Sequence, residues 1–360
     1  MLRHTEALTV PLALSTSSVE RMVGVSAGTA AVLGLHRLRQ ADAPTTAYLM
    51  VGERCTYNCA FCAQARHSAA RAHFLSRVVW PLYPQDTAAI AVAQAFARHE
   101  IQRCCLQVTA SPDSFRQTVT LVEQLRALSA VPISTSIVVA QLDEVRVLLE
   151  RGVDRVTLAL DAACDRVHRS AKGCGWRRRL ELLQQAATRF PGHVGTHLIV
   201  GLGETEREMA QVLQQMIDWR VSVGLFSFTP VSGTSWEERL PPPLASYRRI
   251  QAARYLMTMG ACRVEDLNFS PSGQIVSYGL NADRMWDLLW DGGAFETAGC
   301  LGCNRPYYNE RPGRTMYNYP RPLGKDEATM AITAAMAAPE PRMDGSEPRT
   351  GEGLANGRRR

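Results

Sequence analysis

Three cysteines, Cys55, Cys59 and Cys62, stand within eight residues of the sequence. Their C-x3-C-x2-C spacing places three thiolates on one short segment, with the aromatic Phe61 directly before the third. Three such thiolates can bind three irons of a cubane [4Fe–4S] cluster and leave the fourth iron without a protein ligand. An open iron can hold a small chelating molecule, which a four-cysteine site cannot do.

A zinc ion is the alternative for these cysteines. Structural zinc sites usually take four protein ligands, often from two separated pairs. Three clustered cysteines do not match that pattern, so the spacing favours the iron–sulfur cluster. A zinc-binding interaction protein remains the alternative outside the enzymes.

The motif resembles the signature of the radical S-adenosylmethionine (radical SAM) superfamily. The resemblance implies that Cys55, Cys59 and Cys62 bind the cluster and that SAM chelates the open iron. It also implies reductive cleavage of SAM to methionine and a 5′-deoxyadenosyl radical, which abstracts a hydrogen atom from the substrate. The three cysteines would then be the catalytic residues as well as the metal ligands.

Asp161 follows an apolar run and could bind the ribose of a nucleoside, because a carboxylate accepts two hydrogen bonds from a vicinal diol. An equally good reading is a helix N-cap, a position that favours Asp. The resemblance to the biotin-synthase-like branch implies the ribose contact, although Ala159 replaces an Asn of that branch.

The segment Ile199-Val200-Gly201-Leu202-Gly203 is by itself a weak dinucleotide signal, because the third glycine of the fingerprint is missing. In company with the cysteines it resembles the SAM segment of the same branch. That resemblance implies that Ile199 and Val200 contact adenine. Biotin synthase itself is rejected, because only Cys105 falls where that enzyme has ligands for its second cluster, and Gly195 occupies another of those positions.

A second cysteine pair, Cys300 and Cys303, lies in a glycine-rich turn. A C-x2-C pair supplies two ligands to a metal or cluster, and we expect a second Fe–S cluster here. Its remaining ligands are left open by the sequence. The candidates are Cys104, Cys105, Cys164, Cys174 and Cys262.

The run from Cys300 to Pro312, with the earlier segment Leu75 to Pro81, resembles the two-protein (archaeal-type) lipoyl synthases. The resemblance implies sulfur insertion into a protein-bound octanoyl chain, and hence a transferase of lipoate biosynthesis. The implied partners are an octanoylated carrier protein, a second radical SAM protein and an electron donor such as ferredoxin or flavodoxin. A radical SAM ring-former, mutase or methylation-type enzyme without sulfur insertion is the alternative within the enzymes.

The elements that must position these residues alternate between strand and helix, which predicts an α/β fold with a parallel sheet. We expect a full or partial (βα) TIM-like barrel, with the first cysteines after the carboxyl end of its first strand. The expected strands are 48–51, 103–109, 132–139, 155–160, 196–200, 224–229 and 263–269. The expected division is an N-terminal helical extension (1–44, helix over 19–40), a barrel (45–270), a C-terminal extension (271–335) and a disordered tail (336–360).

Composition sets the remaining bounds. The chain has 360 residues, of which 46% are hydrophobic, and a formal net charge of +6. No clustered basic run with interleaved aromatics is present, so we expect no nucleic-acid partner. No apolar run approaches the roughly 20 residues that a membrane span requires, so we expect no membrane partner. Ten cysteines with three in one turn indicate metal ligation in a reducing compartment, and we expect a cytoplasmic protein.

Overall fold

The computed structural model describes residues 21–310 and 313–338. Its main feature is a curved eight-stranded sheet with the order β10-β9-β8-β7-β6-β2-β1-β5. Six of these strands run parallel, from β2 to β10, and they are β2 (Thr46–Val51), β6 (Arg103–Val108), β7 (Ile133–Ser136), β8 (Arg155–Thr157), β9 (Val194–Val200) and β10 (Ser222–Ser227). The strands form a linear series, so the described part of the chain is a partial (βα) barrel. The predicted α/β fold is confirmed.

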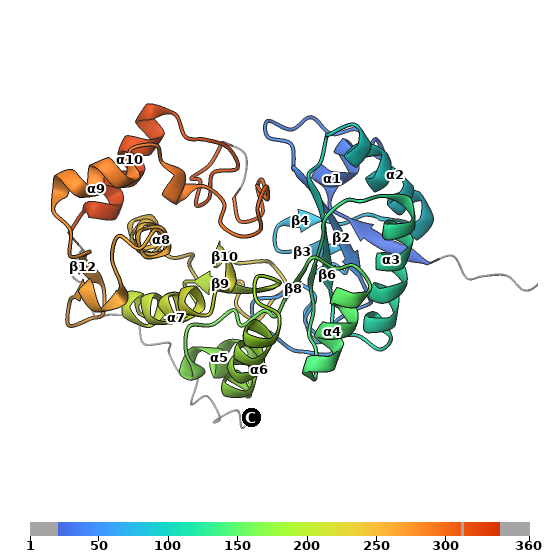
Figure 1. The fold of residues 1–360 in the computed structure, drawn as a ribbon, viewed down its shortest axis with the longest axis horizontal. Coiled ribbons are helices and arrows are strands. Elements are labelled where there is room, and N and C mark those ends of the chain that lie inside the picture. The colour runs from blue at the N-terminus through green and yellow to red at the C-terminus, as the bar shows by residue number, and fades with distance from the viewer. Residues whose placement is uncertain (1–20, 311–312, 339–360) are drawn as a thin grey trace, which may run out of the picture.

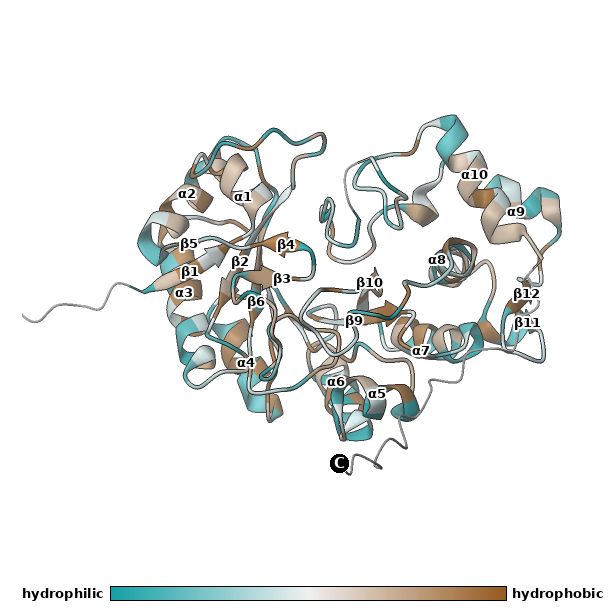
Figure 2. Cartoon of the chain, turned by 180° about the vertical axis from the view of Figure 1, so that it is seen from behind, coloured by the Kyte–Doolittle hydropathy of each residue, from teal (hydrophilic) through white to brown (hydrophobic). Residues whose placement is uncertain are grey.

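Helices follow the parallel strands and pack on the outer side of the sheet (Figure 1). They are α2 (Gln85–Ala97), α3 (Ser114–Leu128), α4 (Leu142–Glu150), α5 (Asp165–Lys172), α6 (Trp176–Arg189), α7 (Glu206–Asp218) and α8 (Leu244–Thr258). Figure 2 shows the hydrophobic residues on the strands and the hydrophilic ones on the exposed sides of the helices. Every residue of β2 is buried, as expected for a strand that is covered on both faces.

The expected helix over 19–40 is wrong over most of its described length, because residues 33–40 form turns and irregular structure. Residues Met22–Val25 form strand β1, and only Ala27–Val32 form a short helix, α1. The β-branched residues of β1 favour a strand, and β1 pairs antiparallel with both β2 and β5 (Leu82–Pro84). Gly24 permits this close approach, because an added Cβ would lie 3.2 Å from the Cβ of Met50. Residues 1–20 lie outside the described part of the chain.

The seventh barrel strand expected over 263–269 is also wrong. This segment forms a short 3-10 helix, Val264–Asp266, and a two-residue strand, β11 (Asn268–Phe269). Strand β11 pairs antiparallel with β12 (Ile275–Ser277) in a separate small sheet. Leu267 is buried and Val264 and Phe269 are partly buried against the main core, but the segment does not pair with β10. Its apolar character alone therefore led to the wrong element.

The C-terminal extension contains α9 (Ala282–Leu289) and α10 (Lys325–Met336) and packs on α8 (Figure 1). Buried Arg248 of α8 donates hydrogen bonds to the carbonyls of Met316 and Tyr317 at 2.5 and 2.7 Å. Buried Arg249 forms an ion pair with Glu206 of α7, with 2.7 Å between Nη2 and Oε1. The Arg248 bonds hold the extension on α8, and the Arg249 ion pair joins α8 to α7. Residues 339–360 of the expected disordered tail lie outside the described residues.

A short hairpin, β3 (Phe74–Leu75) and β4 (Val78–Val79), follows the first cysteine segment. Among the described helices, none combines the length and the apolar character that a bilayer span requires.

Candidate functional site: two cysteine groups around the barrel interior

The first three cysteines lie in the long loop after the carboxyl end of β2, as predicted. This loop is folded around the side chain of Arg54. The guanidinium donates hydrogen bonds to four backbone carbonyls, those of Ala63, Ala65, Ser68 and Ala70, at 2.9–3.4 Å. Four carbonyls on one cation fix the path of the loop without a regular element.

Two thiols of this loop, those of Cys59 and Cys62, are neutral at pH 7 unless a cation is near. Burial raises the pKa of Cys59 to about 11 and the pKa of Cys62 to about 12. Bound irons supply the positive charge that makes such thiols ionise. The residues therefore fit an iron-containing group, with the three cysteines as its ligands.

The donor set also bears on the zinc alternative. In the described residues, no three His, Cys, Asp or Glu side chains converge closely enough to hold one metal ion. A closed zinc site needs four ligands on one ion. A cubane cluster does not need this convergence, because each thiolate binds a different iron.

Asp161 lies beside the first cysteines and is not a helix cap. Helix α5 begins at Asp165 with Cys164 as its N-cap, so that interpretation of Asp161 is wrong. Its backbone has a left-handed φ of 64° and bonds to β9, donating to His197 O and accepting from Ile199 N–H, each at 2.8 Å. Its Oδ2 lies 2.5 Å from the Nζ of Lys172. The ribose contact stays a prediction.

Lys172 is a site residue that the sequence analysis missed. Its side chain is only 7% exposed and that of Asp161 only 12%. Both charges lie near enough to Cys59 to influence its pKa, which Lys172 lowers and Asp161 raises. The one feature of the sequence that could have pointed to Lys172 is the rarity of its residue type, because Lys172 and Lys325 are the only lysines of the chain.

Ile199 and Val200 have different surroundings. Ile199 is half-buried and lines a cavity with Cys62 and Asp161, whereas Val200 is buried in the main core. The carbonyl of Val200 accepts a hydrogen bond from Phe228 N–H at 2.8 Å. The structure thus brings Ile199 to the cysteine loop but turns the Val200 side chain away from it. The adenine contact stays a prediction for both residues.

The cavity beside Cys62 has a volume of about 150 Å³ and lies inside the barrel. Its wall includes His197 of β9, Phe226 of β10, and Tyr308 from the C-terminal extension. Burial lowers the pKa of His197 to about 4, so its imidazole is neutral at pH 7. The cavity offers a largely uncharged surface next to the cysteine loop.

The second cysteine pair faces the barrel interior as well. Cys300 and Cys303 line a smaller cavity of about 40 Å³, with Cys105 of β6 in the same wall. Tyr48 of β2 places its hydroxyl 3.2 Å from the Sγ of Cys303, and the Oγ of Ser134 lies 3.5 Å from the Sγ of Cys300. The sequence analysis identified this pair but could not locate it in the fold.

The other candidate cysteines lie elsewhere. Cys104 and Cys262 are buried in the main apolar core. Cys164 donates to Glu208 Oε1 at 3.2 Å in an outer groove, and Cys174 is exposed. Of the five candidates, Cys105 alone lines the cavity of Cys300 and Cys303.

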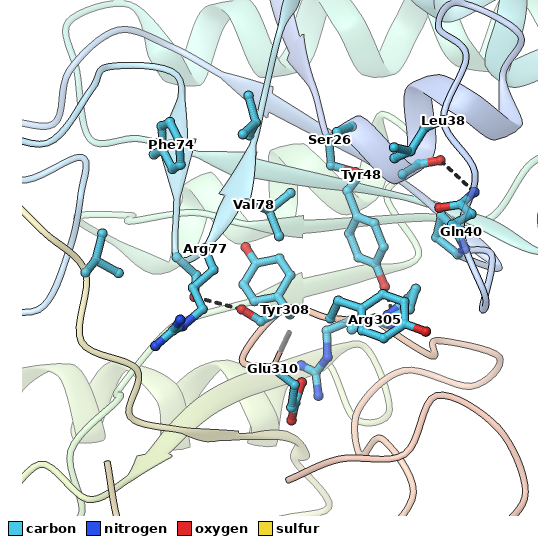
Figure 3. Close-up of a pocket in the computed structure, with 18 of the residues that line it drawn as sticks. Ser26, Leu38, Gln40, Tyr48, Phe74, Arg77, Val78, Arg305, Tyr308 and Glu310 are labelled. Atoms are coloured by element: carbon cyan, nitrogen blue, oxygen red, sulfur yellow. Dashed lines mark hydrogen bonds between the residues drawn. The ribbon is translucent and has the colours of Figure 1, made fainter. Parts of the chain in front are cut away.

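A third, larger cavity of about 760 Å³ opens next to these two. Figure 3 shows Tyr48, Arg305 and Tyr308 at its inner end, with Leu38, Phe74 and Val78 along its sides. Tyr308 lines all three cavities. Its backbone carbonyl accepts from the Oγ of Ser76 at 2.9 Å. Tyr308 therefore stands where the three spaces meet.

Comparison with known families finds a match over most of the barrel. Residues 49–216 match the profile of the Radical SAM superfamily. This segment is a radical SAM domain, and the family implies an enzyme with a [4Fe–4S] cluster and SAM. None of the curated proteins matches the sequence.

The chain is also similar to solved structures, of which three are described by sequence identity, TM-score and the share of each chain that is covered. The FeFe-hydrogenase maturase HydG from Carboxydothermus hydrogenoformans has 15% identity, a TM-score of 0.47, and coverage of 60% of this chain and 51% of its own. Methylornithine synthase (PylB) has 15% identity, a TM-score of 0.49, and coverage of 59% and 62%. The radical SAM methyltransferase TsrM from Kitasatospora setae has 11% identity, a TM-score of 0.38, and coverage of 58% and 39%. The chain thus spans about half of the HydG chain and less than two thirds of the PylB chain.

Proposed function

We propose that this chain is a radical SAM enzyme that inserts sulfur into an octanoyl chain on a carrier protein, as one component of a lipoyl synthase. One observation carries the proposal. The cavity of Cys62 and the cavity of Cys300 and Cys303 share a wall of four residues, which are Gln107, His197, Phe226 and Tyr308. A substrate held at this wall has one cysteine group on each side.

The two groups suit a division of labour. When bound, the front cluster with SAM supplies the radical that removes a hydrogen atom from carbon, and a cluster at Cys300 and Cys303 supplies sulfide. The chain itself orients the partners of this chemistry. Asp161 and Ile199 line the front cavity, where they can hold the nucleoside, and Lys172 neutralises the Asp161 carboxylate from inside the protein.

The shared wall excludes water from the reacting carbon. Phe226 packs its ring against His197 with 5.0 Å between the ring centroids and against Tyr308 with 5.8 Å. The neutral His197 and the neutral Tyr308 hydroxyl, whose pKa burial raises far above its usual value, add polar contacts without charge. Enclosing a reactive intermediate in this way limits its side reactions.

The large outer cavity supports an acyl substrate carried by another protein. It leads from the surface to Tyr48 and Tyr308, and Leu38, Phe74 and Val78 give it apolar sides (Figure 3). A flexible aliphatic chain fits a space of this kind. The carrier protein stays outside, together with the proposed second radical SAM protein and an electron donor such as ferredoxin or flavodoxin.

The proposal is tested with anaerobically reconstituted protein, SAM, a reductant and an octanoylated lipoyl domain, with and without a second radical SAM protein. Mass spectrometry of the domain is expected to show a gain of sulfur together with formation of 5′-deoxyadenosine. The matched control is Cys300→Ala, which is expected to keep SAM cleavage and to lose the sulfur gain. Formation of 5′-deoxyadenosine without any sulfur gain would instead support a ring-former, mutase or methylation-type enzyme.

A further inference from the structure

The cavity of Cys300 and Cys303 is built by two parts of the chain, the barrel strands and a segment that follows the barrel in sequence. Its barrel side consists of inward-facing residues of β2, β6 and the strands beyond them, among them Tyr48 and Cys105. Its other side is the segment 299–308 of the C-terminal extension. The extension therefore closes one end of the barrel and brings its thiols against a barrel thiol.

The segment that carries the cysteine pair is clamped to the barrel on both sides. Buried Arg103, at the start of β6, donates to Leu301 O at 3.0 Å and to the Oγ of Ser134 at 2.7 Å. Thr45 donates through its hydroxyl to Gly302 O at 2.6 Å and through its N–H to Asn304 Oδ1 at 2.9 Å. These hydrogen bonds between the barrel and the segment 301–304 fix the positions of the Cys300 and Cys303 thiols.

Cys105 differs from its neighbour Cys104 in the direction of its side chain. Successive residues of a strand point to opposite faces. Cys104 is buried in the core between the sheet and the helices, whereas Cys105 packs in the interior cluster with Tyr48, Tyr308 and Cys303. Strand β6 thus presents one thiol to the helices and one to the cavity.

The chemistry of the cavity walls favours a small inorganic group. The cavity has a volume of about 40 Å³. Three thiols face it, and Gln107 Nε2, the Tyr48 hydroxyl and the Ser134 hydroxyl lie 3.1–3.5 Å from their sulfurs. Thiols with hydrogen-bonding neighbours are the usual ligand shell of an iron–sulfur cluster.

We infer that Cys105, Cys300 and Cys303 together hold the second iron–sulfur cluster, at the interface between the barrel and the C-terminal extension. This inference rests on the proposed function for the existence of that cluster, and adds its third protein ligand and its place. Three cysteines leave one iron free of a thiolate. The cluster would face the substrate through the wall that contains Gln107 and Tyr308.

The experiment isolates the second cluster from the first. The parent protein is the full chain with Cys55→Ala, Cys59→Ala and Cys62→Ala, so that iron bound after anaerobic reconstitution reports on the rear site. Cys105→Ala and Cys105→Ser are each added to this parent, and Cys104→Ala is the matched control on the same strand. Iron per chain and the ⁵⁷Fe Mössbauer spectrum are measured, and circular dichroism verifies that each variant is folded.

The parent and the Cys104→Ala variant are expected to bind iron with an Fe–S spectrum. Both Cys105 variants are expected to fall to near-background iron while staying folded. Retention of the parent's iron by both folded Cys105 variants would overturn the inference but leave a cluster at Cys300 and Cys303. If the parent itself binds no cluster, both the inference and the sulfur-donor role fail, whereas SAM cleavage by the wild-type chain would still uphold the radical SAM activity.

Discussion

The buried ion pair between Lys172 and Asp161 makes a sharp test of how the front site is built. Lys172 lies on α5 and reaches back to Asp161, with 2.5 Å between Nζ and Oδ2, and it also donates to Ala159 O at 3.1 Å. The perturbation is Lys172→Met, which keeps most of the side-chain volume and removes the charge. Asp161→Asn and the double variant complete a mutant cycle.

The magnitude follows from burial. With the two side chains 7% and 12% exposed, loss of the lysine leaves a carboxylate buried without compensation, which costs about 3–5 kcal/mol of unfolding free energy. The double variant removes both charges, so its cost is expected to be below the sum of the single costs by up to about 3 kcal/mol. Arg169→Met on the same helix is the control. Its partner Asp165 is 37% exposed and Arg169 itself 70%, so the loss is expected to be below about 1 kcal/mol.

The assay has two parts. Urea unfolding of the cluster-free protein gives the unfolding free energies, and equilibrium dialysis of SAM against reconstituted protein gives its Kd. Asp161→Asn is expected to weaken SAM binding by about 10- to 150-fold, since a hydrogen bond to a charged acceptor contributes about 1.5–3 kcal/mol. Additive stability losses would refute the coupling of the pair. An unchanged Kd for SAM in Asp161→Asn would refute the ribose contact.

Three further predictions concern the cavity walls. Burial lowers the pKa of His197 to about 4, below the value of about 6.5 in the unfolded chain. The unfolding free energy is therefore expected to fall as the pH decreases from about 6.5 to about 4. Urea unfolding at several pH values should show a smaller loss of unfolding free energy in His197→Gln than in the wild type. Replacing Tyr308 by alanine removes the side chain that separates the three cavities. Tyr308→Ala is therefore expected to form 5′-deoxyadenosine several-fold faster than the wild type in the absence of substrate. Tyr308→Phe keeps the ring and is expected to form it at the wild-type rate. Gly233 has φ of 85°, and an added Cβ would clash with Ala70 N, so Gly233→Ala is expected to lower the unfolding free energy by about 1–3 kcal/mol. An unchanged urea midpoint would contradict this.

The sequence predicted the parallel strands well, because their apolar runs are buried on both faces and are bounded by turn residues. Strand β9 was located to within two residues. The wrong elements, at 19–40 and 263–269, are segments whose apolar residues pack against a different neighbour from the one expected. Residues 22–25 pair with β2 and β5, which are up to about 60 residues away, and local periodicity does not contain that information.

The candidate site also combines features that a local pattern predicts with features that depend on distant parts of the chain. The spacing of Cys55, Cys59 and Cys62 could be read directly, because all three lie on one loop. The meeting of Cys105 with Cys300 and Cys303 depends on how the C-terminal extension closes the barrel, which no local pattern encodes. Lys172 was missed for the same reason, since its partner Asp161 lies on the preceding loop and only the fold brings their charges together.

The central claim is that the front cysteines form the SAM-cleaving site. The most direct measurement is 5′-deoxyadenosine formed from SAM under dithionite by anaerobically reconstituted wild-type protein, by Cys59→Ala, and by Cys174→Ala as the exposed-cysteine control. The wild type and Cys174→Ala are expected to form 5′-deoxyadenosine at equal rates, and Cys59→Ala is expected to form none. Formation of 5′-deoxyadenosine by Cys59→Ala at the wild-type rate would contradict the claim.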